Sequence, residues 1–406
     1  MCARTAPSSH GPALLLVAGE PSGDSIAGGI ARALLPQGVR CFGMGGSACE
    51  QSGVELVADL RRSAAMGFTE VAARLPAVVS AYAKLASSAR LERPRAAALV
   101  NYTEFNARLG RHLRRRRIPV LWCVAPQVWA WRRGRMRSIS RALDRLAVIL
   151  PFEERLWREA GVDAHYVGHP ALDVVLPERV AARAELGLDR GTPCVALLPG
   201  SRAHEVTRHA AAMIGAVREL ARRGTPVQAR LIAAASLDAA SRRRLGAIAA
   251  AAGVAVIDVA PGASAIPWLR AFDAALVTSG TATLESALAG APPVIVYRMS
   301  PLSAALARRL IRTPFIGLPN ILLGSRQYPE LVQEQVEARR MAREVALVLE
   351  RGDSFQASAE ELRRRLAYSG QDASSRTSYE RIARLAQEWL RPDELHEELP
   401  ARVERA

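Results

Sequence analysis

Three turns of the sequence bring glycine, hydroxyl and charged residues together directly after apolar runs. They are VAGEPSGDSIAGGI at 17–30, LLPGSRAHE at 197–205 and VTSGTATLE at 277–285. Where a buried strand passes into a helix, exposed backbone amides and the helix dipole favour an anion. Ligands of doubly wound sheets bind at this end of the strands. The three turns therefore predict a site for a phosphate group or a sugar.

The second and third turns together predict a pocket for a nucleoside diphosphate. Arg202 follows the end of an apolar run, and its planar guanidinium can pair with a diphosphate. The segment 279–281 supplies hydroxyl and backbone donors at the start of a helix. Glu285, about one helical turn further on, can accept from both hydroxyls of a ribose. The structural alternatives are an ordinary surface arginine and a favourable charge in the first turn of a helix.

The first turn carries two carboxylates, Glu20 and Asp24, which could hold sugar hydroxyls. Gly19 and Gly23 would permit tight backbone bends there, and we expect the helix to begin near Asp24 or Ser25. The turn matches neither the dinucleotide-binding pattern GxGxxG nor the phosphate-binding pattern GxxxxGK[ST]. A structural turn and a ligand-binding loop are therefore both open interpretations.

The sequence predicts neither a metal centre nor a serine hydrolase. No Asp-x-Asp pair is present, and the seven histidines lack the spacing of metal ligands. The nucleophile pattern GxSxG is also absent. If a diphosphate leaves during the reaction, arginine and helix dipoles must balance its charge. We therefore expect no metal and no cofactor.

The composition limits which binding partners and which cellular compartment we expect for the protein. The formal net charge is +16, but Lys84 is the only lysine, and an arginine excess is typical of GC-rich genomes. Aromatic residues, at 5%, do not alternate with basic ones as a base-stacking surface requires. We therefore expect no nucleic-acid partner, and a surface facing anionic lipid or a phosphorylated substrate explains the charge as well. Scattered cysteines and the absence of a long apolar run indicate a cytosolic protein.

Apolar runs alternate with helical patterns through most of the chain, which predicts an α/β protein with parallel sheets covered on both faces. Strands are expected at 13–19, 96–100, 118–124 and 145–151, and, after a restart at 192–205, at 227–234, 255–260, 273–280 and 292–297. We expect two doubly wound Rossmann-like domains at 1–170 and 171–345. Charged helices at 346–406, with a frayed end, would complete the chain.

One predicted helix carries an apolar face that has two possible interpretations. Within VAARLPAVVSAYAKLA at 71–86, the apolar residues recur at intervals of four and three, which places them on one side of a helix. They are Val71, Leu75, Val78, Tyr82 and Leu85. Packing in the core is the favoured interpretation. The alternative is an exposed face that enters the surface of a membrane.

In order and density, a set of short segments resembles the lipid-A-disaccharide synthase family. The match runs from residue 13 to about residue 335. Its segments are AGEPSGD (18–24), FGMGG (42–46), MGFTEV (66–71), APQVWAWRRGR (125–135), LPFE (150–153), VGHP (167–170), LLPGSRAHE (197–205), SGTATLE (279–285), LPN (318–320) and PELVQ (329–333). Members of this family are glycosyltransferases of the GT-B type, in which two Rossmann-like domains face a central cleft.

The resemblance implies a reaction, a location and a set of donor-side residues. A UDP-2,3-diacylglucosamine donor and a 2,3-diacylglucosamine 1-phosphate acceptor would be joined in a β-1,6 linkage with inversion, without a metal, releasing UDP. The protein would lie peripherally on the cytosolic face of the inner membrane, with an apolar patch near 66–85. Its C-terminal helices would cross back to the first domain or pack on the second subunit of a homodimer. The donor side would comprise Gly200, Ser201, Arg202, Ser279, Gly280, Thr281, Glu285, Asn320, Glu330 and Gln333.

The acceptor side shows one departure from the family pattern. At the position that here follows the expected strand at 96–100, the family has Asp-x-Pro-x-Phe-Asn, and its aspartate is the favoured catalytic residue. This chain has NYTEFN at 101–106. An amide cannot take the proton of the attacking hydroxyl, so Asn101 cannot be a general base. The acceptor-side residues implied are Glu20, Ser22, Gly23, Asp24, Asn101, Glu104 and Asn106. We hypothesise that Glu104 compensates; Glu20 or Asp24 is the alternative base.

Other interpretations keep the UDP pocket but assign the chain a different reaction or no reaction. The chain could be another GT-B transferase or a UDP-sugar epimerase, or it could be a binding protein that has lost activity with the replacement at position 101. The intact donor pocket favours the transferase, because drift after a loss of function would also have eroded Arg202 or Glu285.

Overall fold

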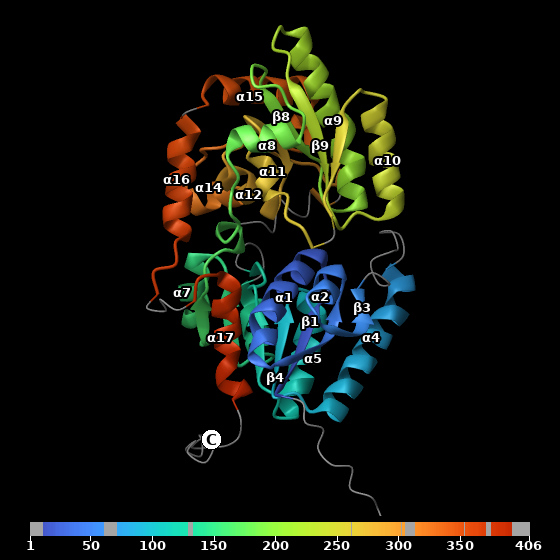
Figure 1. Ribbon diagram of the computed structural model, residues 1–406, viewed down its shortest axis with the longest axis vertical. Coiled ribbons are helices and arrows are strands. Elements are labelled where there is room, and N and C mark those ends of the chain that lie inside the picture. The colour runs from blue at the N-terminus through green and yellow to red at the C-terminus, as the bar shows by residue number, and fades with distance from the viewer. Residues whose placement is uncertain are drawn as a thin grey trace, which may run out of the picture.

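The protein consists of two α/β domains stacked along its long axis (Figure 1). This computed structural model describes residues 11–60, 71–128, 133–260, 262–301, 303–304, 313–352, 354–370 and 375–391. Each domain contains one parallel sheet with helices on both faces, as the alternating pattern predicts.

The first domain is built on a parallel seven-stranded sheet with the order β3-β2-β1-β4-β5-β6-β7. Its strands are β1 (Ala13–Ala18), β2 (Arg40–Gly45), β3 (Glu55–Asp59), β4 (Ala96–Val100), β5 (Val120–Cys123), β6 (Arg145–Val148) and β7 (Ala164–Tyr166). Its helices are α1 (Pro21–Leu34), α2 (Ser47–Gln51), α4 (Val71–Glu92), α5 (Thr103–Arg115), α6 (Met136–Ser140) and α7 (Pro151–Glu159). The strand order reverses between β1 and β4, so the loops after these strands border the crevice where such folds bind ligands.

The second domain repeats this design with the strand order β10-β9-β8-β11-β12-β13. Its strands are β8 (Cys194–Leu198), β9 (Gln228–Ala233), β10 (Ala255–Asp258), β11 (Ala274–Thr278), β12 (Pro293–Tyr297) and β13 (Glu330–Val332). Its helices are α8 (Arg179–Glu185), α9 (Ala203–Arg222), α10 (Ala239–Ala250), α11 (Ile266–Leu269), α12 (Thr281–Ala289), α14 (Leu318–Leu323), α15 (Ala338–Glu350) and α16 (Ser354–Leu366). Here the order reverses between β8 and β11, so the second and third turns lie side by side.

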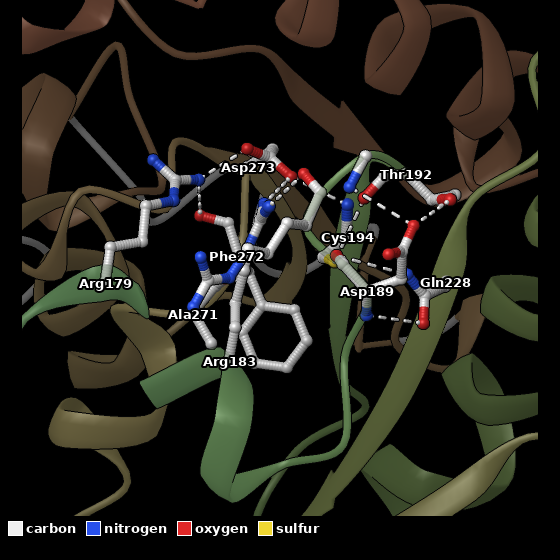
Figure 2. Close-up of polar contacts among 11 residues, drawn as sticks. Arg179, Arg183, Asp189, Thr192, Cys194, Gln228, Ala271, Phe272 and Asp273 are labelled. Carbon is white, nitrogen blue, oxygen red and sulfur yellow. Dashed lines mark hydrogen bonds and ion pairs between the residues drawn. The ribbon is translucent and has the colours of Figure 1, made fainter. Parts of the chain in front are cut away.

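A carboxylate fixes the connection between the domains to the second sheet. Asp273, just before β11, pairs with Arg179 and Arg183 of α8 and accepts a hydrogen bond from Cys194 N at 2.7 Å (Figure 2). The guanidinium of Arg183 also donates to Ala271 O at 2.9 Å. The helix that follows the linker is thereby held against the starts of β8 and β11.

The chain returns to the first domain at its C-terminal end. After α15 and α16, which pack on the second domain, α17 (Ser378–Leu390) lies against α1 of the first domain (Figure 1). Ile382, Ala383 and Ala386 are buried in the core that α1 shares with β1 and β4. The described part of the last predicted segment therefore belongs to both domains.

The favoured interpretation of the apolar face of α4 is confirmed where its side chains are described. Leu85 is fully buried in the core of the first domain, and Val78 and Tyr82 pack against that core. The other two residues of the predicted face, Val71 and Leu75, lie outside the described side chains, as does the part of the implied apolar patch at 66–70. None of the helices in the described segments has the length and apolarity needed to cross a membrane.

The start of the first helix differs from the expectation. Helix α1 begins at Pro21 rather than near Asp24 or Ser25, because proline is well suited to the first position of a helix. Gly23 therefore lies inside the helix, and neither Gly19 nor Gly23 has a positive φ. The chain does bend at Glu20, directly after Gly19, but Gly23 provides no bend.

Candidate functional site

The loops after β1 and β4 interlock at the crevice of the first domain. A Cβ atom on Gly19 would lie 2.0 Å from the ring of Tyr102, so only glycine leaves room for this ring. Tyr102 stacks on Phe105, with 5.1 Å between the ring centroids. Asn101 Nδ2 donates to Ser22 Oγ at 3.3 Å. The two acceptor-side segments of the sequence therefore form one unit.

The backbone at the departure from the family pattern has an unusual conformation. Asn101 and Tyr102 both have left-handed φ values, 51° and 55°, and α5 begins at the next residue. Asparagine and aspartate tolerate this conformation better than most residues. Asn106, which is fully buried, donates through Nδ2 to Asn101 O and holds the turn in place. The backbone would therefore accept the aspartate of the family at position 101.

Asp24 is buried and has a structural role in the first domain. Its Oδ1 accepts from Gly46 N at 2.6 Å and Cys49 N at 3.1 Å, and its Oδ2 accepts from Ala48 N at 2.9 Å. These bonds attach the N-terminus of α2 to α1. With both carboxylate oxygens bound to backbone amides and only 6% of the residue exposed, Asp24 has little access to a substrate. The geometry thus favours the other carboxylates as candidate bases.

Glu20 and Glu104 are the two accessible carboxylates of the first-domain crevice loops. Glu20 is the N-cap residue of α1, and its Oε2 lies 4.0 Å from Nη2 of Arg202 in the second domain. Glu104, in the first turn of α5, is mostly exposed and pairs with Arg135. Glu20 therefore faces the second domain, whereas Glu104 pairs with an arginine of its own domain.

Glu205 organises the turn after β8. It is buried, and its Oε2 accepts from Ser201 N at 2.9 Å and Arg202 N at 3.2 Å. Its Oε1 accepts from Arg202 Nη1 at 3.2 Å. Gly200 has a φ of 118°, and a Cβ there would lie 2.5 Å from Glu205. Sequence reasoning did not assign Glu205 a role, although a Glu three residues after an N-cap position is a known capping signal.

The turn after β11 leaves the start of α12 accessible. Gly280 and Thr281 are exposed, while Ser279 Oγ donates to Ile316 O at 2.8 Å and Thr283 Oγ1 donates to Gly280 O at 2.7 Å. The exposed start of the helix can attract an anion through its backbone amides and dipole. Only part of the Glu285 side chain is exposed, and burial raises the pKa of its carboxyl to about 7. Glu285 therefore holds a proton more readily than an exposed glutamate.

Two of the other donor-side residues form a buried hydrogen-bond network. Glu330 Oε1 accepts from Gly317 N at 3.0 Å and Asn320 Nδ2 at 2.9 Å, and its Oε2 accepts from Ile316 N at 3.0 Å. Asn320 Oδ1 accepts from Tyr328 N at 2.9 Å. Since Ile316 in turn holds Ser279, this network fixes the position of the turn after β11.

Gln333 and His209 hold the segment that follows β12, and His209 attaches it to the turn after β8. Gln333 has a left-handed φ of 56°, and its Oε1 accepts from Met299 N at 2.7 Å. Its backbone oxygen accepts from Arg298 Nε at 3.2 Å. His209 Nε2 accepts from Arg298 N at 2.8 Å, and its Nδ1 lies 2.7 Å from Glu205 O. His209 has no striking neighbours in the sequence, so only the fold reveals its role.

The structure brings the predicted residues together in two groups. The acceptor-side group is joined by Asn101 and Ser22, and the donor-side group lies at the adjacent ends of β8 and β11. Among the described residues, the carboxylate partners of Arg202 are Glu205 and, across the domains, Glu20, and no hydrogen bond or ion pair joins Arg202 to the turn after β11. In the described residues, no three His, Cys, Asp or Glu side chains gather as a metal site would require.

Comparison with known proteins assigns these features to one family. The model of the lipid-A-disaccharide synthetase family matches residues 14–385. The lipid-A-disaccharide synthase of Syntrophus aciditrophicus (strain SB) is 42% identical over 355 residues, covering 86% of this chain and 91% of the relative. That of Myxococcus xanthus (strain DK1622) is 40% identical over 341 residues, covering 83% and 88%.

Solved structures with the same fold are far less similar in sequence. Arabidopsis thaliana UGT89C1 complexed with UDP has a TM-score of 0.61 at 12% identity, covering 93% of this chain and 100% of that chain. The UDP-GlcNAc 2-epimerase from Neisseria meningitidis bound to UDP-GlcNAc has a TM-score of 0.60 at 10% identity, covering 93% and 99%. At such low identity these structures show the GT-B fold alone.

Proposed function

The chain belongs to the lipid-A-disaccharide synthase family and is a glycosyltransferase, and on this premise we propose the reaction that it performs. It transfers 2,3-diacylglucosamine from a UDP donor to the 6-hydroxyl of 2,3-diacylglucosamine 1-phosphate. The product is a β-1,6-linked disaccharide 1-phosphate, and UDP is released. The relatives that carry this name match most of their own length to this chain.

One observation supports the proposal most strongly. Arg202, beside the predicted diphosphate site, reaches Glu20 of the acceptor-side unit, with 4.0 Å between Nη2 and Oε2. The crevice loops of the two domains therefore meet, as transfer between a donor on one domain and an acceptor on the other requires. Close approach of two bound substrates lowers the barrier by removing the entropy cost of their encounter.

The transfer requires one proton acceptor and a stabilised leaving group. The acceptor oxygen attacks the anomeric carbon from the side opposite to the diphosphate, and the bond from that carbon to the phosphate oxygen breaks. The proton of the attacking hydroxyl passes to a carboxylate, for which Glu20 and Glu104 are the candidates. The negative charge on UDP is balanced by the guanidinium of Arg202 and the dipole of α12. The proposal therefore includes no metal, and EDTA should leave the rate unchanged.

Glu285 and the second turn hold the nucleotide in this proposal. The carboxyl of Glu285 binds the two ribose hydroxyls, and the exposed amides at the start of α12 bind the phosphates. Glu205 supports this pocket indirectly, because it fixes the backbone that carries Arg202.

The location and assembly are also part of the proposal. Both substrates carry acyl chains, so the protein works at a membrane surface, on the cytosolic face of the inner membrane, without crossing it. Sedimentation with vesicles would test this point. A homodimer is the proposed assembly, and light scattering of the purified chain would show the mass of one chain if this is wrong.

A product assay separates the proposed reaction from its rivals. Mass spectrometry of a reaction with both diacylated substrates should reveal a disaccharide 1-phosphate. An epimerase would change the UDP donor without forming a disaccharide, and an inactive descendant would bind UDP but turn over no acceptor.

A further inference from the structure

A strongly basic cavity lies in the first domain, away from the crevice loops. It has a volume of about 620 Å³ and is lined by the end of α5, the segment before β5 and the segment before β6. Its charged lining residues are Arg111, Arg114, Arg115, Arg117, Arg141 and Asp144. Because the cavity lies where β5 and β6 begin, it is at the opposite edge of the sheet from the loops that follow the strands.

Among the residues that the structure describes, a carboxylate pairs with just one of these arginines. Arg114 binds Asp144 through Nε at 3.1 Å and Nη2 at 3.0 Å, and Asp144 also accepts from Val120 N at 2.9 Å. For the other four guanidiniums, no carboxylate lies within ion-pair distance in the described part of the chain. Four positive charges therefore border one cavity without a carboxylate partner.

Other arginines around the same sheet show that this arrangement is not general. Arg40 pairs with both Glu55 and Glu92, and Arg145 pairs with Asp163 and Glu388. These side chains are neutralised by partners within the protein. In contrast, four guanidiniums around the cavity have no carboxylate partner in the described part of the chain, and they lie together, so their charge is available to one ligand.

The pKa of His112, on the same helix as Arg111 and Arg115, responds to the positive charges around it. Its pKa is lowered first by burial and then by the positive charges of Arg116 and Arg115. Arg116 Nε also donates to His112 Nε2 at 3.0 Å, which favours the neutral ring. The histidine therefore adds no further positive charge near neutral pH, and the arginines alone define the cavity.

We propose that this cavity binds a water-soluble ligand that carries two or more phosphate groups. Guanidinium groups bind phosphate oxygens through paired hydrogen bonds, and several of them around one cavity suit a ligand with several phosphates. The choice of a soluble ligand over a lipid headgroup rests on the proposed function. If the crevice faces the membrane to receive acylated sugars, the opposite edge of the sheet faces water.

Calorimetric titration with inorganic tripolyphosphate tests this site directly. The full chain is saturated with UDP so that the donor site is occupied, and no enzymatic activity is needed for the readout. We expect one binding event in the wild type. The triple variant Arg111→Gln, Arg117→Gln, Arg141→Gln should bind at least about a hundredfold more weakly, since each lost charged contact costs roughly tenfold.

A matched variant controls for the loss of net charge. Arg243→Gln, Arg244→Gln and Arg340→Gln remove the same charge from exposed positions of the second domain and should leave the affinity within about twofold. Circular dichroism confirms that both variants are folded. Absence of binding in the wild type, or equal weakening in both variants, would overturn the proposal.

Two further arms separate the soluble ligand from other polyanions. Flotation with phosphatidylglycerol vesicles should be equal for the wild type and the variant that lacks the cavity arginines. A loss of vesicle binding in that variant alone would assign the cavity to the membrane and contradict the proposal. Retention on duplex DNA that depends on the same arginines and resists tripolyphosphate would contradict it as well.

Discussion

The guanidinium of Arg202 in the second domain lies opposite the carboxylate of Glu20 in the first, with 4.0 Å between Nη2 and Oε2. The two residues are the N-cap residues of α9 and α1, the helices that follow the central strands β8 and β1. In the proposed reaction, a bound diphosphate would compete with Glu20 for this guanidinium. We infer that donor binding turns Arg202 toward the phosphates and leaves Glu20 free to face the acceptor.

Replacement of Arg202 should destabilise the transition state of the transfer more than it destabilises the folded protein. We expect Arg202→Gln to lower kcat/KM for the UDP donor by about ten- to a hundredfold, because a charged contact to the leaving diphosphate is lost. Steady-state kinetics with varied donor measure this effect. Arg243→Gln, an exposed arginine of the same domain, is the control. Equal values of kcat/KM in both variants would show that Arg202 does not belong to the donor site.

The two candidate bases can be separated by single amide variants. Loss of a general base lowers kcat by about a hundredfold or more. We hypothesise that Glu104→Gln has this effect, while Glu20→Gln has it if Glu20 is the base instead. A Glu104→Gln protein that turns over at the wild-type rate ends the hypothesis for Glu104.

Restoration of the family aspartate tests the departure at position 101. Asn101→Asp should fold normally, because aspartate tolerates the φ of 51° and can accept a hydrogen bond from Ser22 Oγ. If Glu104 serves as the base, kcat should change by less than about tenfold. A larger gain in single-turnover rate would show that the native site lacks an efficient base.

Glu285 should link stability to pH. Burial raises its pKa from the ordinary value of 4.5 to about 7, so the folded state holds a proton that the unfolded state has lost. Its contribution to stability is therefore fully present below pH 4.5 and is lost as the pH rises through 7. Glu285→Gln should raise the free energy of unfolding at pH 8 by on the order of 2 kcal/mol and leave it nearly unchanged at pH 4.5.

The same substitution should weaken nucleotide binding. Glutamine offers the two ribose hydroxyls only one acceptor oxygen, so UDP should bind more weakly to the stabilised variant. Urea titrations at both pH values and UDP calorimetry measure the two effects. Equal stabilisation at both pH values would show that the carboxyl does not titrate as described.

Gly19 and Tyr102 should behave as a coupled pair. Gly19→Ala places a methyl group 2.0 Å from the Tyr102 ring and should destabilise the protein by about 1–3 kcal/mol. The double variant Gly19→Ala, Tyr102→Ala removes the clash and should recover part of this loss. A double-mutant cycle on urea unfolding gives the coupling energy. Strict additivity of the two changes would contradict the close packing of these loops.

Short sequence patterns predicted the central strands and the turns that follow them. The apolar runs identified both central strand pairs, and the turns after β8 and β11 lie at adjacent strand ends. The start of α1 was missed because the glycine-rich segment before Asp24 suggested a turn, whereas Pro21 already begins the helix. The short strand β2 was not expected, because its sequence RCFGMG contains two glycines.

The rest depends on contacts between distant segments. Nothing beside His209 in the sequence indicates that it links Glu205 to Arg298, which lies 89 positions later. The partners of Asp24 are amides more than 20 positions away, so its charge looked catalytic until the fold was known. The return of α17 to α1 depends in the same way on tertiary packing, which periodicity does not encode.

The measurement that tests the central claim most directly is product analysis of the purified chain with both diacylated substrates, with Arg202→Gln measured in parallel. The account predicts a β-1,6-linked disaccharide 1-phosphate in equal amount to UDP, formed much more slowly by the variant. An altered UDP donor without a disaccharide, or UDP release that is unaffected by loss of Arg202, would contradict it.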